Sequence, residues 1–242
     1  MPDAPRTTQP HHAGRLSAAR AAIVLILCAT ALFALGAVLG FTAVGRTGGG
    51  PIQSWDDTVW HWAISHRGPF VGVAKTVATV GDAPVLGLIC VLLTAALMWW
   101  LQSPRALVPL VAYLGAEFEV FAIRLVIHRP RPASADFPAP GAIRGVHETN
   151  FSYPSGHAVA VTAVLFAGLG TVAFTRRWAW PWLVALVTSM AVADTRLILG
   201  VHWFSDLLIG LLIGTAWGVT VAFVGQRIGW ADFAALRRLL PR

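Results

Sequence analysis

The sequence Tyr153-Pro154-Ser155-Gly156-His157 stands directly before an apolar run that extends to Thr175. Ser155 is a favourable N-cap residue, so a helix is expected to begin there. About 20 apolar residues suffice for a helix to cross the hydrocarbon core of a bilayer. The stretch therefore predicts a membrane-spanning helix over residues 155–175, with His157 in its first turn.

Other apolar runs on both sides of this helix predict that the whole chain is built in the same way. They cover residues 21–45, 83–102, 106–128, 178–199 and 203–226. The composition agrees, because 56% of the 242 residues are hydrophobic and only 12% are charged, whereas soluble domains carry about 25% charged residues. We expect an all-α integral membrane protein, a bundle of six transmembrane helices.

The segment between the first two runs, residues 55–82, mixes acidic and basic side chains with tryptophans and apolar residues. It is too polar to span a membrane and too apolar to stand free in water. Tryptophan favours the headgroup region of a bilayer. We therefore expect an amphipathic helical segment that lies on the outer face.

The distribution of basic residues predicts which face is outer. Six spans place both termini on one side, and the loops on that side contain Arg105, Arg176 and Arg177. Basic residues are enriched on the cytoplasmic side of membrane proteins. The termini are therefore expected to be cytoplasmic, and the loop before Ser155 is expected to be extracytoplasmic.

Three regions are expected along the chain. Residues 1–20 predict a disordered cytoplasmic tail, residues 21–226 form the membrane domain, and residues 227–242 predict a basic amphipathic cytoplasmic tail. A signal peptide is the alternative for residues 21–45, but this run is longer than the apolar core of a signal peptide. The net charge of +7 is spread over tails, loops and motifs. It therefore indicates contact with membrane lipids and no nucleic-acid partner.

Two further stretches bring ionisable residues to the ends of apolar runs. Residues 124–132 read Arg-Leu-Val-Ile-His-Arg-Pro-Arg-Pro, and residues 195–206 read Thr-Arg-Leu-Ile-Leu-Gly-Val-His-Trp-Phe-Ser-Asp. Charged side chains are costly at membrane depth and therefore indicate function. Guanidinium groups bind phosphate through paired donors, and a histidine can attack phosphorus or donate a proton near neutral pH. With His157, these residues predict a phosphate-handling site.

The spacing of these residues suggests a physical role for each. His202 and Asp206 are four residues apart and share one helix face, so the carboxylate can fix the tautomer of the imidazole. Arg196 precedes His202 by six residues and can reach the same phosphate. Ser155 caps a helix whose free amides form an anion site, and Gly156 lets the backbone approach phosphate oxygens.

Two more arginines, Arg124 and Arg131, provide positive charge. They are expected to neutralise the transferring phosphoryl group, which is the main electrostatic task in such reactions. The prolines on either side of Arg131 stiffen the chain around it.

The three stretches together resemble the signature of the type 2 phosphatidic acid phosphatase superfamily, K-x6-R-P, P-S-G-H and S-R-x5-H-x3-D. The middle motif matches in full, whereas Arg124 replaces the lysine of the first and Thr195 replaces the serine of the third. The resemblance covers roughly residues 55–225. It implies that His202 is a nucleophile that forms a phosphohistidine, and that His157 protonates the leaving oxygen.

The function expected from this resemblance is a metal-independent membrane phosphatase acting at the outer leaflet. Its substrate would be a lipid phosphate or pyrophosphate, such as a polyprenyl pyrophosphate (undecaprenyl pyrophosphate, for example), phosphatidic acid or phosphatidylglycerol phosphate. No cofactor or metal is expected, because the sequence shows no carboxylate cluster and no His/Cys ligand spacing. A phosphotransferase with a lipid or sugar hydroxyl as acceptor is the alternative, followed by a transporter.

Several ionisable residues outside these roles are left with open alternatives. Glu117 and Glu119 can pair with a motif arginine, line the substrate groove or serve packing alone. Asp194 is a candidate for orienting Arg196 or Arg124, and His128 is a weaker candidate for substrate contact. The two cysteines, Cys28 and Cys90, are expected to be small packed residues rather than a disulfide.

Overall fold

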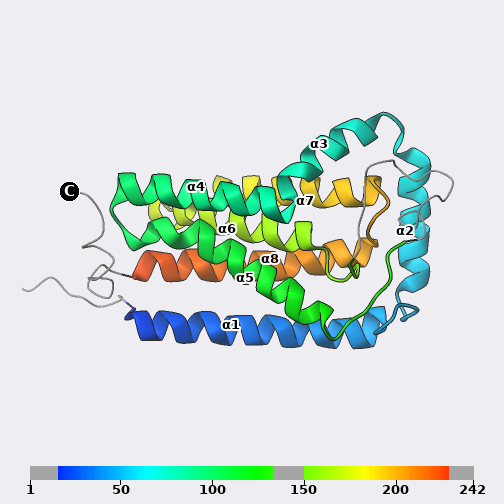
Figure 1. The fold of residues 1–242 in the computed structure, drawn as a ribbon, viewed down its shortest axis with the longest axis horizontal. Helices are drawn as coiled ribbons and strands as arrows, with labels where there is room; N and C mark the ends of the chain where they lie inside the picture. The colour runs from blue at the N-terminus through cyan, green and yellow to red at the C-terminus, as the bar shows by residue number, and fades with distance from the viewer. Residues whose placement is uncertain (1–15, 133–149, 229–242) are drawn as a thin grey trace, which may run out of the picture.

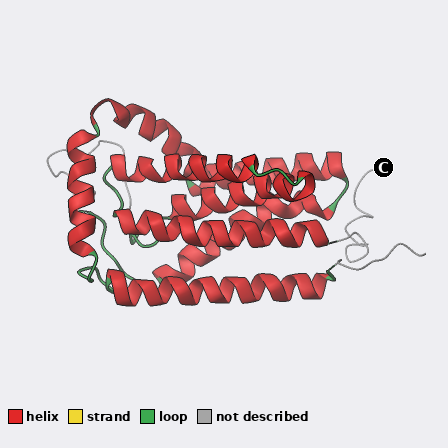
Figure 2. Cartoon of the chain, turned by 180° about the vertical axis from the view of Figure 1, so that it is seen from behind, coloured by secondary structure: helices red, strands yellow, loops and turns green. Residues whose placement is uncertain are grey.

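The computed structural model describes residues 16–132 and 150–228, which form a bundle of long helices with a shorter helix across one end (Figure 1). Figure 2 shows helices and loops, without strands, over this described part of the chain. Within it, six helical segments are long and apolar enough to cross a membrane: Ala18–Val44, Ala83–Leu101, Pro104–Arg124, Gly156–Arg176, Trp180–Ile198 and Phe204–Arg227. The expected all-α bundle of six transmembrane helices is confirmed.

The first span begins earlier than expected. Helix α1 (Ala18–Leu39) is capped by Ser17, whose side chain accepts a hydrogen bond from the backbone of Arg20, and it continues into a π-helical turn, Gly40–Val44. The N-terminal tail predicted over residues 1–20 is therefore too long by three residues. The rest of that tail, up to residue 15, lies outside the described residues, and so does the C-terminal tail from residue 229.

The third span ends earlier than expected. After a 3-10 turn, Pro104–Leu107, helix α5 covers Val108–Arg124 and does not reach His128. Beyond its end the chain turns towards the end of the first span: Ile127 is fully buried, and the His128 amide donates to the carbonyl of Arg46 at 2.7 Å. This contact with the turn that follows the first span takes the place of further helical hydrogen bonds, a tertiary effect that hydropathy does not contain.

The other spans agree with the expected ranges to within two residues. They are α4 (Ala83–Leu101), α6 (Gly156–Arg176), α7 (Trp180–Ile198) and α8 (Phe204–Arg227). Helices α6 and α8 pack along each other in the interior of the bundle. Glycines of α8 allow this, because an added Cβ would lie 2.5 Å from the Val159 carbonyl oxygen at Gly214 and 2.5 Å from that of Ala163 at Gly218. Small residues of this kind let membrane helices approach closely.

The segment between the first two spans forms two helices rather than one. Helix α2 (Gln53–His66) crosses one end of the bundle, and α3 (Val71–Gly81) returns from it to the start of α4, after a 3-10 turn at Gly68–Phe70 (Figure 1). The polar character of α2 reflects its position at the end of the bundle rather than along its side.

The two ends of the bundle differ in what they carry. The described chain ends, near residues 16 and 228, lie at the end opposite α2 (Figure 1). Arg105, in the turn before α5, and Arg176, at the end of α6, lie at the same end as these described chain ends. These basic residues therefore lie at the end of the bundle opposite α2, and the positive-inside rule describes such an asymmetry between the two ends.

Candidate active site

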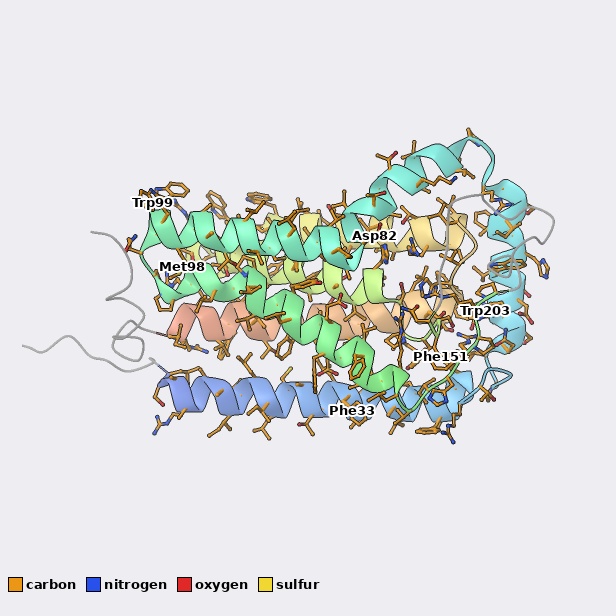
Figure 3. The ribbon with its side chains drawn as sticks, viewed as in Figure 1. Phe33, Asp82, Met98, Trp99, Phe151 and Trp203 are labelled. Atoms are coloured by element: carbon orange, nitrogen blue, oxygen red, sulfur yellow. The ribbon has the colours of Figure 1, made fainter. Side chains whose placement is uncertain are left out.

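The three sequence stretches meet at the end of the bundle covered by α2. Helices α5 and α7 end there and α6 and α8 begin there, so Arg124 is the last residue of α5, His157 lies in the first turn of α6, and Asp206 lies in the first turn of α8. His202 lies in the turn between α7 and α8. Figure 3 shows Asp82 and Trp203 towards this end and Met98 and Trp99 at the other.

A pocket of about 410 Å³ opens at this end. Five of the predicted site residues line it: Arg124, Arg131, Gly156, His157 and His202. The remaining lining residues come from the α3–α4 junction, from α5 and from the loop before α6, and are Gly81, Asp82, Ala83, Pro84, Val85, Glu117, Val120 and Asn150.

His202 presents an unprotonated nitrogen to Arg131. Arg131 Nη1 lies 2.8 Å from His202 Nε2, and a guanidinium group can only donate, so Nε2 accepts and the ring hydrogen is on Nδ1. Nδ1 faces Asp206 Oδ2 at 3.4 Å. Burial, followed by the positive charges of Arg131, Arg196 and Arg124, holds the pKa of His202 well below its usual value. The imidazole is therefore neutral, and Nε2 keeps its lone pair.

Asp206 lies behind His202, outside the pocket lining, and is fully buried. Its Oδ1 accepts a hydrogen bond from Arg129 Nη1 at 2.7 Å, and its Oδ2 accepts one from the Trp203 amide at 3.1 Å. The expected pairing of Asp206 with His202 is present, but the arginine contact is the shorter of the two.

Arg129 is a residue of this region that sequence reasoning did not assign. Its side chain is completely buried, and besides Asp206 it donates to Ser205 Oγ at 2.8 Å, to Asp56 Oδ2 at 2.6 Å and to Gln53 Oε1 at 2.9 Å. Asp56 also accepts hydrogen bonds from the amide and the hydroxyl of Ser205. Helix α2 thus braces the start of α8 through Arg129.

The signals for this network in the sequence are weak. Arg129 stands between the motif residues Arg124 and Arg131 and directly before Pro130, and this position is the signal that could have marked it as part of the site region. Asp56 had no local signal, because its partner Arg129 is 73 positions away in the chain.

His157 is held by the junction between α3 and α4. Its Nε2 lies 3.1 Å from the carbonyl oxygen of Ala78 and 3.1 Å from Asp82 Oδ1. A Cβ added at Gly81 would lie 2.6 Å from the ring atom Cδ2, so the glycine allows the ring to pack against the backbone. Asp82 was not assigned from the sequence either.

Arg131 and Arg124 are held differently. Arg131 donates to the Val201 carbonyl at 2.8 Å, to the Asn150 carbonyl at 2.9 Å and to Asn150 Oδ1 at 2.6 Å. Arg124 donates through Nη2 to the Pro154 carbonyl at 3.0 Å. Both guanidinium groups face the pocket, so two positive charges stand beside the two histidines.

The three predicted residues that do not line the pocket are Ser155, Arg196 and Asp206, and they support those that do. Ser155 is fully buried and caps α6, its Oγ accepting from the Ala158 amide at 3.5 Å. Arg196 is only 3% exposed and contributes its charge beside His202. Gly156, by contrast, does line the pocket, and its face there is open, since an added Cβ would come no nearer than 3.8 Å to Arg124 Nη2.

The residues with open alternatives fall into different places. Glu117 lines the pocket, whereas Glu119 is fully buried and its carboxylate oxygens have no hydrogen-bond partner among the described residues. Asp194 is exposed on α7, whereas Arg196 is buried, and its role in orienting Arg196 or Arg124 stays a prediction. His128 stacks on Phe151, with ring centroids 4.6 Å apart, and does not line the pocket.

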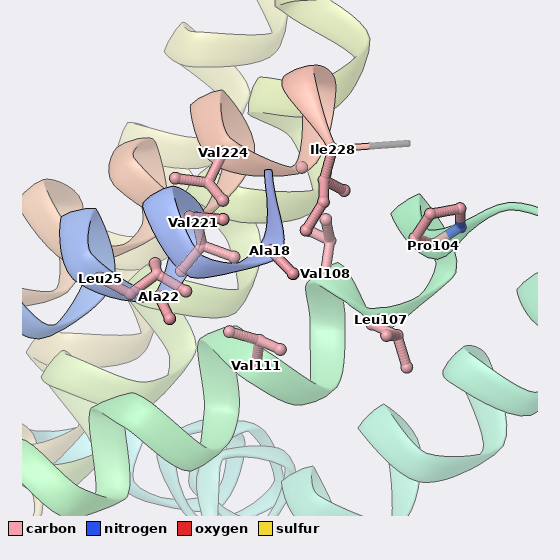
Figure 4. Close-up of a pocket in the computed structure, with 12 residues that line it drawn as sticks. Ala18, Ala22, Leu25, Pro104, Leu107, Val108, Val111, Val221, Val224 and Ile228 are labelled. Carbon is pink, nitrogen blue, oxygen red and sulfur yellow. The ribbon is translucent and has the colours of Figure 1, made fainter. Parts of the chain in front are cut away.

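The two cysteines and a second, apolar cavity lie outside the pocket lining. Cys28 and Cys90 are free. A cavity of about 240 Å³ lies at the opposite end of the bundle between α1, α5 and α8, and Figure 4 shows the apolar side chains around it. Within the described ranges, no group of three or more His, Cys, Asp or Glu side chains could hold a metal ion.

Fold and site together define a multi-pass helical membrane protein with a cationic, histidine-containing pocket at one end. Residues 105–230, just over half of the chain, match the sequence profile of the PAP2 superfamily. The chain belongs to this superfamily, which confirms the resemblance seen in the three motifs.

Individual relatives are similar over parts of the chain. The undecaprenyl-diphosphatase of Sulfolobus acidocaldarius is 36% identical over 28% of this chain and 30% of its own length. Phosphatidylglycerophosphatase B of Escherichia coli is 33% identical over 34% and 32%. A decaprenylphosphoryl-5-phosphoribose phosphatase of Mycobacterium tuberculosis is 37% identical over 48% and 60%. The alignments thus span about a third of the first two relatives.

One solved structure covers most of the chain. The transmembrane PAP2 type phosphatidylglycerolphosphate phosphatase from Bacillus subtilis superimposes with a TM-score of 0.61 over 84% of this chain and 93% of that protein. The sequence identity is 23%, so the likeness establishes the fold.

Proposed function

We propose that this protein is a membrane phosphatase that hydrolyses a lipid phosphate or diphosphate through a phosphohistidine on His202. The observation that carries the proposal is the 2.8 Å contact between Arg131 Nη1 and His202 Nε2 at the wall of a pocket that also contains Arg124 and His157. A substrate phosphate that binds between Arg131 and His202 would take the place of the guanidinium next to Nε2. The guanidinium would then bind the phosphate oxygens. Nucleophile and charge stabiliser are therefore already adjacent.

In the first step, the lone pair of His202 Nε2 attacks phosphorus. The bond between phosphorus and the leaving oxygen breaks, its electron pair goes to that oxygen, and His157 donates the proton that neutralises it. Arg124 and Arg131 balance the negative charge on the phosphoryl oxygens. Asp206 stabilises the positive charge that His202 acquires when it forms the P–N bond.

In the second step, water attacks the phosphohistidine. Neutral His157 accepts a proton from the water, the P–N bond breaks, and its electron pair returns to His202 Nε2. The products are inorganic phosphate, a lipid alcohol or lipid monophosphate, and the enzyme in its starting protonation state.

The lipid character of the substrate is supported by the place of the pocket. Its wall includes Ala83, Pro84 and Val85 at the start of α4, so an apolar chain can leave the pocket along a membrane-spanning helix. The named activities of the three relatives concern a polyprenyl diphosphate, a phosphatidylglycerophosphate and a polyprenyl phosphoribose phosphate. We infer a substrate with a terminal phosphate on a lipid.

The pocket is proposed to face the extracytoplasmic side of the cell membrane. The loops with Arg105, Arg176 and Arg177 are at the opposite end of the bundle, and basic loops favour the cytoplasm. The substrate would then enter from the outer leaflet.

The test is phosphate release from a panel of lipid phosphates and diphosphates in detergent with EDTA. Wild type is expected to release phosphate, and His202→Ala is expected to lose release by about 10⁴-fold or more. His66→Ala, an exposed histidine on α2 outside the pocket, is the matched control and should keep wild-type activity. Equal release by wild type and His202→Ala would reject the assignment.

Two further measurements separate the alternatives. Brief exposure to a ³²P-labelled substrate should label wild type with an acid-labile phosphate, as expected for a P–N bond, and should not label His202→Ala. Addition of a lipid or sugar alcohol shows whether phosphate is transferred in place of being released, which would make the protein a phosphotransferase. Liposome flux without phosphate release would indicate a transporter.

A further inference from the structure

The junction of α3 and α4 directs a carboxylate at the proposed proton donor. Asp82 stands between Gly81, the last residue of α3, and Ala83, the first residue of α4, and Figure 3 shows it at that junction. Aspartate at such a position usually caps the following helix by accepting a backbone amide. Asp82 makes no such cap; its Oδ1 lies 3.1 Å from His157 Nε2 instead.

The contacts of His157 determine which of its nitrogens carries hydrogen. Nε2 lies 3.1 Å from the Ala78 carbonyl oxygen, which can only accept, so Nε2 carries hydrogen. The Cδ2 atom, next to Nε2 in the ring, faces Gly81. Nδ1 is the ring atom opposite the Cδ2–Nε2 bond and therefore points away from the α3–α4 junction.

We propose that Asp82 is a positioning residue for His157: it holds Nε2–H and leaves Nδ1 to carry the proton that the leaving oxygen receives. This inference rests on the proposed function. When the ester bond breaks, the Nδ1–H bond breaks as well, its electron pair stays on the imidazole, and the proton goes to the leaving oxygen. Nε2–H stays hydrogen-bonded to Asp82 throughout, and the negative carboxylate stabilises the imidazolium that precedes the transfer.

The charges around His157 make such a carboxylate necessary. Arg196, Arg131 and Arg124 all place positive charge near the ring, and each opposes the positive charge that the ring acquires on protonation. Asp82 is the carboxylate in direct contact with His157, whereas Glu117, the other pocket carboxylate, is not within hydrogen-bonding distance of the ring. Asp82 is half exposed to the pocket, so its replacement should not unfold the protein.

The experiment compares two substrates that differ in their leaving group. One is an alkyl lipid phosphate, whose alcohol leaves only with a proton. The other is a nitrophenyl phosphate with the same hydrocarbon chain, whose phenolate leaves without one. Loss of proton donation slows the alkyl substrate selectively, whereas a structural defect or weaker phosphate binding slows both.

The measured quantity is kcat/KM, which reports the step that breaks the ester bond and excludes the later hydrolysis of the phosphohistidine. For Asp82→Asn, kcat/KM with the alkyl substrate should fall about tenfold, and for Asp82→Ala about 100-fold, while kcat/KM with the aryl substrate should change less than about threefold. His157→Asn should show the same pattern with a larger loss, and Asp82→Glu should recover most of the alkyl activity. Glu117→Gln is the matched control, since it removes a pocket carboxylate that does not touch His157. Its effect should be the same for both substrates.

The outcomes separate this inference from the proposed function. If His157→Asn discriminates between the substrates and the Asp82 variants affect both equally or not at all, the role of Asp82 is rejected and the phosphatase proposal stands. If wild type hydrolyses neither substrate nor any lipid phosphate of the panel, both proposals are rejected. Thermal unfolding of each variant in detergent verifies that it is folded, and the isosteric Asp82→Asn provides the comparison if Asp82→Ala is not.

Discussion

Arg129 and Asp206 form an ion pair of 2.7 Å between Nη1 and Oδ1, and both side chains are completely buried. The same carboxylate faces His202 Nδ1 at 3.4 Å. The position of the proposed nucleophile therefore depends on an arginine that is itself anchored to Asp56 on α2. The helix across the end of the bundle is in this way part of the support of the site.

Removal of Arg129 should destabilise the protein strongly. Arg129→Ala leaves Asp56 and Asp206 buried without their shared cation, and breaking a buried ion pair in this way costs about 3–5 kcal/mol. Thermal unfolding in detergent measures the loss. Arg46→Ala, an exposed arginine, should change the free energy of unfolding by less than about 0.5 kcal/mol. Equal melting temperatures for wild type and Arg129→Ala would contradict the role of this network.

Asp206→Asn should abolish most of the activity with little change in shape. The amide of asparagine can donate to His202 Nδ1, which would move the ring hydrogen to Nε2 and remove the lone pair that attacks phosphorus. A loss of kcat of about 10³- to 10⁴-fold is expected, in line with the tautomer effect in histidine–aspartate pairs. Steady-state phosphate release and ³²P labelling of His202 both report it. Retention of kcat within a factor of about ten would show that the carboxylate does not set the tautomer.

Replacement by lysine should have different effects at the two pocket arginines. Arg124 donates through Nη2 to the Pro154 carbonyl, and lysine occupies this position in the superfamily motif. Arg124→Lys should therefore keep activity within about tenfold. Arg131 uses its planar fork to contact Val201, Asn150 and His202, which a single ammonium cannot reproduce. Arg131→Lys should lower kcat/KM by about 10²-fold or more. Similar losses in both variants would refute the distinction.

The lowered pKa of His202 predicts a pH dependence of stability. In the unfolded chain this histidine takes up a proton below about pH 6.5, whereas burial and the neighbouring arginines keep it neutral in the folded protein. The unfolded state then binds more protons, so the free energy of unfolding contributed by His202 is intact above about pH 6.5 and falls as the pH decreases below it. Below that pH, the melting temperature of wild type should fall relative to that of His202→Asn. A pH-independent difference would rule this out.

Close packing of α6 on α8 can be tested at a glycine. In Gly214→Ala the new Cβ would lie 2.5 Å from the Val159 carbonyl oxygen, so the helices must separate, at a cost of about 1–3 kcal/mol. Gly168→Ala on α6 meets no atom within 4 Å and should be neutral or stabilise the helix by about 0.5–1 kcal/mol. Thermal unfolding compares the two variants. Equal effects would show that the helices do not pack as described.

Much of the fold was predictable because it follows from local properties. The apolar runs that cross the membrane appear in the sequence as uninterrupted segments, and their ends were placed within a few residues except at His128. That end was missed because the chain leaves the helix to pack Ile127 against the π-helical turn at the end of the first span. The clustering of the candidate site residues was predictable for a similar reason, since the motif spacings put Arg124, His157 and Asp206 at helix ends.

The sequence by itself determined the number of apolar spans, the end of the bundle where the charged motifs gather, and the His202–Asp206 register, because hydropathy and helical spacing act over a few residues. Only the tertiary structure decided which side chains hold the two histidines. Arg129 and Asp206 are 77 positions apart, and Asp82 and His157 are 75 apart. Such distant pairs form because an unpaired charge is costly once it is buried, and these side chains are buried only after the helices have packed.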